Sequence, residues 1–181
     1  MNLRPWRLLT TLFLASLAHA ASFAQPIDRE KALQIVHATS MLAYWQKAPM
    51  SLLMYCGRMY PPTGTPAQAE YIKWQKRNAE INSQVDKMLA AFAPLIGKYM
   101  KKTPDELQVY MTKATDEEVI TPLEKNLSPA ERARHCGDFG SLLSQMLSDE
   151  LVRPRVNIAL ETLKPYEKRV PTLVADPKHA F

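Results

Sequence analysis

Residues 71–99 read YIKWQKRNAEINSQVDKMLAAFAPLIGKY, and their large side chains follow the spacing of an amphipathic helix. These side chains recur at steps that alternate three and four positions, which puts them on one face of a helix that packs along its neighbours. The face consists of Tyr71, Trp74, Asn78, Ile81, Val85, Met88, Phe92, Leu95 and Tyr99. Pro94 and Gly97 fall in its last turns, where we expect a kink or an early end. The spacing predicts one helix through this segment.

The same alternation of steps appears on both sides of this segment. Upstream it runs through Ile35, Ala38, Leu42, Trp45, Pro49, Leu52, Cys56 and Met59, and downstream through Cys136, Phe139, Leu143 and Met146. Pro49 is expected to bend or split the first helix near Ala48, because proline lacks the amide hydrogen that a helix interior uses. A last helix is expected to begin near Pro154 and to turn Val156, Leu160 and Leu163 inward.

Helix start signals recur in a single form, a hydroxyl residue and proline followed by glutamate or glutamine at the third position. Thr65, Thr103 and Ser128 each open such a signal. The hydroxyl can cap the N3 amide, the acid or amide side chain can reach back to the cap, and proline suits the first helical position. Thr121 opens a fourth, but it lies only seven residues before Ser128, so it predicts one short turn or a kink in the preceding helix.

These patterns predict an all-α protein. No run of alternating β-branched residues and no Asn-Gly or Asp-Gly hairpin signal occurs in the chain. We expect residues 27–164 to form an antiparallel bundle of four or five helices with one disulfide between helices. Residues 165–181 contain Pro165, Pro171 and Pro177, so we expect an extended or loosely ordered tail there.

The first twenty residues have the layout of a signal peptide. Arg4 and Arg7 precede an apolar run from Leu8 to Leu17, and Ala18-His19-Ala20 supplies the small residues that signal peptidase requires. We expect cleavage after Ala20, with a second possible cut after Ala24. The apolar run is shorter than the roughly 20 residues of a membrane-spanning helix. The sequence therefore predicts export to the periplasm or the cell exterior, with no transmembrane anchor after cleavage.

The chain contains two cysteines, in YCGR at 55–58 and HCGD at 135–138. Both lie on predicted inward faces, and an oxidising compartment favours a disulfide between Cys56 and Cys136. A glycine follows each cysteine, which we interpret as making room where two helices meet; the first of them could instead end its helix. A reactive thiol is the weaker hypothesis, because His135 is adjacent to Cys136 and side chains adjacent in a helix point about 100° apart.

Asn78 is the one polar member of the apolar face in 71–99. A buried amide needs hydrogen-bond partners and often fixes the register of a bundle; contact with a ligand is the alternative. Met41, Met50, Met54 and Met59 crowd the first helix, and we interpret them as core filling rather than as copper ligands. Haem held by one of these methionines and His37, His135 or His179 is equally disfavoured. We expect no metal, no cofactor and no catalytic constellation.

These expectations favour an exported, non-enzymatic binding protein that acts on another protein or an envelope component, for example an inhibitor, an immunity-type partner or an assembly factor. The alternative is a carrier of a small ligand or cofactor, with a pocket between the helices near Asn78 and the Met/Trp region. An enzyme would need clustered titratable groups, which the sequence does not indicate. Nucleic acid is not expected as a partner, because no nucleic-acid-binding motif occurs and the chain is predicted to be exported.

Overall fold

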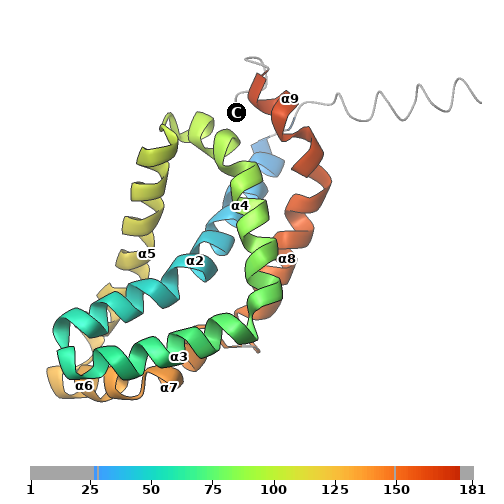
Figure 1. Ribbon diagram of the computed structural model, residues 1–181. Coiled ribbons are helices and arrows are strands. Elements are labelled where there is room, and N and C mark those ends of the chain that lie inside the picture. Colours follow the sequence, from blue (N-terminus) through green and yellow to red (C-terminus); the bar gives the residue numbers. More distant parts are fainter. Residues whose placement is uncertain (1–26, 28, 149, 176–181) are drawn as a thin grey trace, which may run out of the picture.

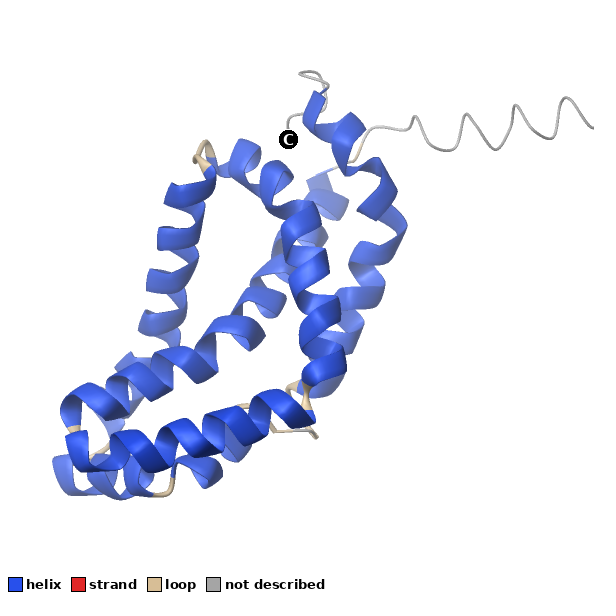
Figure 2. Cartoon of the chain, in the orientation of Figure 1, coloured by secondary structure: helices blue, strands red, loops and turns tan. Residues whose placement is uncertain are grey.

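The computed structural model describes residues 27, 29–148 and 150–175, and this part of the chain is helical without any strand (Figures 1 and 2). The predicted signal peptide, both of its cleavage sites and the end of the predicted tail, residues 176–181, lie outside the described residues. No helix in the part described combines the length and the apolar character that crossing a membrane requires.

Helix α2 (Arg29–Met59) is the element around which the others pack, and it contacts α3, α4, α5 and α8. The predicted face is buried, with Ile35, Leu42, Trp45, Leu52 and Cys56 all fully shielded from solvent. Of the bend or split expected at Pro49, the split does not occur, because the helix continues ten residues beyond the proline to Met59. One missing amide is tolerated here, since burial on several neighbouring helices stabilises α2 along its length.

The helix predicted over 71–99 is in fact two helices. A short 3₁₀ helix η1 (Pro61–Thr63) leads into α3 (Gly64–Arg77), and α4 (Ala79–Met100) follows after a break at Asn78. The Asn78 side chain donates to the Trp74 carbonyl at 3.0 Å, which is the local bonding by which asparagine competes with helix continuation. Helix α3 also begins before the predicted Thr65 cap, because the proline pair at 61–62 has already turned the chain.

The start signals at Thr103 and Ser128 are confirmed. Thr103 and Ser128 each accept a hydrogen bond from the third residue of their helix, and Glu106 and Glu131 bond back to the cap, so α5 (Pro104–Asn126) and α6 (Pro129–Gly137) open with complete capping boxes. The signal at Thr121 starts no helix, and its proline lies inside α5. Asp138 then caps α7 (Phe139–Met146) through the Ser141 amide, which divides a second predicted helix into two.

The predicted extended tail is wrong as far as Ala175. Helix α8 (Arg153–Leu163) is followed by the 3₁₀ helix η2 (Lys164–Arg169) and by α9 (Val170–Ala175). Pro165 and Pro171 occupy first turns, where the missing amide hydrogen has no helical partner to lose. Val170 and Leu173 are buried, and the Lys98 ammonium donates to the Val174 carbonyl at 2.8 Å, so this segment belongs to the fold.

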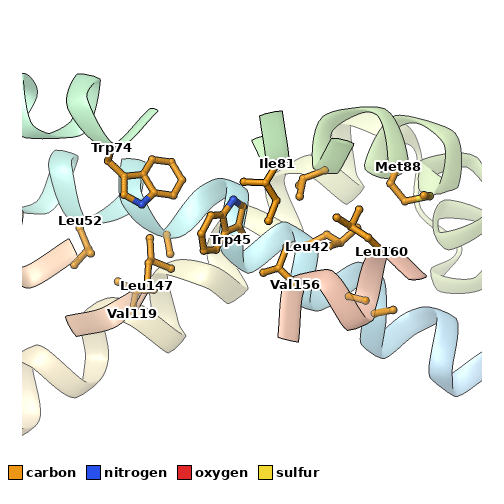
Figure 3. Close-up of a cluster of buried hydrophobic side chains, with 14 of the residues drawn as sticks. Leu42, Trp45, Leu52, Trp74, Ile81, Met88, Val119, Leu147, Val156 and Leu160 are labelled. Carbon is orange, nitrogen blue, oxygen red and sulfur yellow. The ribbon is translucent and has the colours of Figure 1, made fainter. Parts of the chain in front are cut away.

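The helices do not form a simple set of antiparallel rods. Figure 1 shows α3 turned away from the direction of α4, with α5 on the other side of α2 from α8. The described helices outnumber the four or five expected, because Asn78 and Asp138 each divide a predicted helix. The core follows α2 from Leu52 and Trp74 through Trp45 to Met88 and Leu160 (Figure 3). This arrangement leaves the side of α2 between α4 and α5 partly uncovered.

Candidate functional site

Two adjoining cavities lie along the partly uncovered side of α2 and form the candidate site. The first, which we call the apolar pocket, has a volume of about 240 Å³ and lies between α2, α4 and α5. The second, which we call the open groove, has a volume of about 730 Å³ and lies between α2 and α5, with Tyr71 of α3 at its edge. Gln46, Lys47 and Gln108 line both, so the cavities meet at these residues.

The apolar pocket is lined mostly by hydrocarbon. Its apolar residues are Leu89, Ala90, Phe92, Ala93, Ile96, Pro104, Leu107 and Met111. Asp86 lies at the end where the cavities meet, because Gln46 donates to its carboxylate at 2.7 Å. Thr39 also lines the pocket, but its hydroxyl is bonded to carbonyls of its own helix. The pocket therefore has one polar end and an apolar interior.

The open groove combines exposed thioethers with charges of both signs. Met50 and Met54 line it with 40% and 68% of their surface exposed, so the interpretation of these methionines as core filling is wrong. Met59 is also exposed, at the end of α2, and only Met41 packs against the core. The remaining lining residues, apart from the three shared ones, are Ser51, Tyr55, Arg58, Tyr71, Thr112, Asp116, Glu117, Ile120 and Thr121.

Lys47 is a half-buried cation at the junction of the two cavities. Burial lowers the pKa of its ammonium, and the Asp116 carboxylate acts in the opposite direction. Among the described residues the ammonium has no hydrogen bond and no ion pair. A cation held in this way can accept an anionic or carbonyl partner from a ligand.

Two tyrosines border the open groove. Tyr55 is 3% exposed, and its hydroxyl lies close to the Arg132 guanidinium. Burial raises the pKa of Tyr55, and the Arg132 guanidinium opposes this rise. Burial also raises the pKa of Tyr71, whose hydroxyl accepts a hydrogen bond from Gln75 at 2.7 Å. Both phenols are therefore neutral hydrogen-bonding groups at neutral pH.

Cys56 and Cys136 form the predicted disulfide, with 5.3 Å between their Cα atoms and both residues buried. Neither thiol is free, so the pair is a covalent link between α2 and α6. The reason proposed for the neighbouring glycines is wrong. A Cβ atom at Gly57 or Gly137 would meet nothing within 4 Å, and Gly57 lies inside α2 rather than at its end. Nothing in the structure requires glycine at these two positions.

Asn78 is buried as predicted, with 5% of its surface exposed, but it lines a different cavity from Met50 and Met54. It lines a separate cavity of about 420 Å³ at the corner between α3 and α4, together with Arg77, Ser144 and Arg153. Trp74 lines this cavity as well, whereas Met50 and Met54 line the open groove, so the expected pocket near Asn78 and the Met/Trp region is divided between two places. The buried amide bonds within the corner rather than setting the register of two helices.

The residues that were weighed and disfavoured as metal or haem ligands are also dispersed. His37 lines a cavity between α2 and α8 that shares no lining residue with the open groove. His135 lies on α6. Among the described residues, no three histidine, cysteine, aspartate or glutamate side chains are grouped in a way that could hold a metal ion.

The sequence did not indicate Lys47, Gln46 or Gln108 as site residues, because the site depends on how α5 sits against α2. Exposed apolar side chains, unpaired polar groups and opposite charges in one hollow are features of binding surfaces. Comparison with protein families, curated proteins and solved structures finds no match to this chain.

Proposed function

We propose that this chain is an exported, non-enzymatic binding protein that holds an amphipathic segment of a partner protein in the open groove. The observation that carries the proposal is the exposure of Met50 and Met54 on the floor of this groove. Methionine is flexible and polarisable, so a methionine-lined groove adapts to apolar side chains of a partner helix. Met50 and Met54 are one helical turn apart, so they form a contiguous apolar patch rather than scattered side chains, and such patches mark interaction sites.

The charges of the groove favour a partner segment with two polar edges. Lys47 and Arg58 come from α2, while Asp116 and Glu117 come from α5, so the two sides carry opposite charges. A segment with an acidic edge toward α2 and a basic edge toward α5 complements both sides. This arrangement of charges fixes the direction in which the partner segment lies in the groove and disfavours segments that carry charge of one sign only.

Export is supported by the layout of residues 1–20 and by the buried disulfide. Structural disulfides form and persist in oxidising compartments and are rare in the cytosol. The Cys56–Cys136 link has the geometry of a structural bond, since it joins two helices inside the core. A signal peptide and a stapled helical domain fit the same route out of the cell.

Selection from a random displayed peptide library tests the groove directly. With the disulfide-intact protein as bait, we expect selected peptides to carry apolar residues at helical spacing. Replacing both methionines, M50S with M54S, should weaken their binding at least tenfold, because the apolar floor is lost. The matched control is L33S with I158S, which changes two side chains of similar exposure outside the groove. Peptides that bind the M50S/M54S protein as tightly as the wild type would contradict the proposal.

The apolar pocket favours a second candidate function, carriage of a small ligand. Its mostly apolar lining and single polar end are the usual features of a ligand site. The two functions make different predictions. A bound partner segment is displaced by the selected peptides, whereas a small ligand binds between α4 and α5 and its binding does not depend on Met54.

A further inference from the structure

We infer that the apolar pocket binds a medium-chain carboxylate, with its acyl chain between α4 and α5 and its carboxylate on Lys47. This inference rests on the carrier function proposed above and names the chemical class of the ligand. It draws on the polarity of the pocket, its volume, and the unpaired ammonium at its opening.

The pocket has a direction, which follows from the order of its residues along α4. Asp86 lies at the end shared with the open groove, and Ile96 lies ten residues further on, a rise of about 15 Å. Near Ile96 the pocket is lined by Pro104 and Leu107 of the following helix, so the turn between α4 and α5 lies at that end. A ligand that enters past Lys47 therefore points its apolar part toward this turn.

The volume selects the length of the chain. About 240 Å³ is the space of about eight water molecules, and a methylene group is close to water in size. A chain of about eight carbons fills such a space. Apart from Thr39, whose hydroxyl already donates to carbonyls of its own helix, the lining residues of this interior are apolar, so the pocket offers a polar chain few hydrogen bonds beyond its opening.

The headgroup is selected by Lys47. Its ammonium is half-buried without an ion pair, so a carboxylate beside it compensates the loss of hydration. Gln108 lines the same opening and supplies amide hydrogens for the same carboxylate. Asp86 and Asp116 are the acidic groups near this opening, and Gln46 already bonds Asp86. Their charges favour an anion with one negative charge over one with two.

Calorimetric titration with octanoate, octanol, octylamine and octyl phosphate tests the inference on the disulfide-intact protein. We expect octanoate to bind most tightly, and K47M to weaken octanoate roughly three- to tenfold while leaving octanol unchanged. The control is K113M, which removes an exposed lysine of α5 that lines neither cavity. Shortening octanoate to hexanoate should weaken binding about fourfold for each methylene removed.

Two further outcomes separate this inference from the function on which it rests. Ala93→Phe fills the pocket and should abolish octanoate binding, whereas Ala114→Phe, on the exposed side of α5, should not. If octanol binds as tightly as octanoate in both wild type and K47M, the carboxylate assignment is wrong although a carrier pocket exists. If no octyl compound binds, or if Ala93→Phe leaves binding unchanged, the pocket is not the ligand site, and both the carboxylate assignment and the carrier function are wrong.

Discussion

Trp45 has the largest fully buried side chain of the described core, and its one polar atom depends on a single partner. The indole nitrogen donates to the Asn82 side-chain oxygen at 2.8 Å, across from α2 to α4 (Figure 3 shows the ring among its apolar neighbours). Replacing Asn82 by leucine leaves this donor buried and unpaired, so we expect a loss of about 1–3 kcal/mol in the free energy of unfolding. Urea denaturation of the variant measures it.

The control for this prediction is a double-mutant cycle. In a Trp45→Phe background the donor is absent, so the additional effect of Asn82→Leu should largely disappear. Gln46→Ala removes the bond to Asp86, which is exposed to solvent, and should change stability by no more than about 0.5 kcal/mol. Equal effects of Asn82→Leu with and without the indole would show that the bond does not stabilise the fold.

At this scale the sequence predicted some site residues and missed others, for reasons that the helix positions explain. Cys56 lies on the buried face of α2, so its role could be predicted from spacing and compartment. Met50 and Met54 lie off that face, so their exposure could have been predicted from the same spacing. Lys47 was not predictable, because half-burial of an off-face lysine depends on α5, a helix distant in the sequence.

Helix α4 ends in a turn that leaves no room for a side chain at Gly97. A Cβ atom there would lie 2.9 Å from the Lys102 carbonyl oxygen. In this turn the Lys102 amide donates a hydrogen bond to the Gly97 carbonyl, and Lys101 has a positive φ of 54°. Since the obstacle is backbone, we expect Gly97→Ala to destabilise the protein by about 1–3 kcal/mol, measured by thermal unfolding. Gly137→Ala is the matched control, because the space there is open; it should be neutral or slightly stabilising. Similar losses at both positions would contradict this account.

The capping boxes of α5 and α6 give stability a dependence on pH. Hydrogen bonds from Thr103 and Ser128 lower the pKa of Glu106 and Glu131 below the ordinary value of 4.5. Because the folded pKa values are depressed, their stabilisation is present above pH 4.5 and is lost as the pH falls through the lower folded values. We expect the stability difference between wild type and the E106Q/E131Q variant to shrink on acidification from neutral pH to below 4.5. Denaturation at several pH values measures it, and a difference that grows on acidification would exclude the mechanism.

The ends of helices were predictable where a local capping sequence determines them. Thr103 and Ser128 each have proline and glutamate at the right spacing, and both open helices as expected. The breaks at Asn78 and Asp138 were missed, because apolar spacing continues through both positions while their side chains bond to the adjacent backbone. The periodicity of apolar residues predicts which residues are buried, but it does not predict whether they belong to one continuous helix or to two.

The helical class of the whole molecule was predictable, whereas the arrangement of its helices was not. Helix α5 shows why: over 23 residues it buries only Leu107, Thr115 and Val119, which is too sparse a pattern to indicate a packing face. Its position on α2 is set by contacts between segments far apart in sequence, and the groove exists because this packing is incomplete. The candidate site is therefore a property of the assembled fold.

The disulfide constrains the whole molecule, because it joins positions 80 residues apart. Closing a loop of this length removes unfolded-chain entropy worth about 4 to 5 kcal/mol, so C56A/C136A should lose up to this amount of unfolding free energy while keeping its helix content. Wild-type protein refolded under reducing conditions provides a control without a change of side chains at the site. Since both cysteines are buried, reductant should reach the bond only when the fold opens, so the rate of reduction should follow the rate of opening. A loss below about 1 kcal/mol in both tests would show that α2 and α6 hold together without the covalent link. Rapid reduction of the native protein would show instead that reductant reaches the bond without opening of the fold.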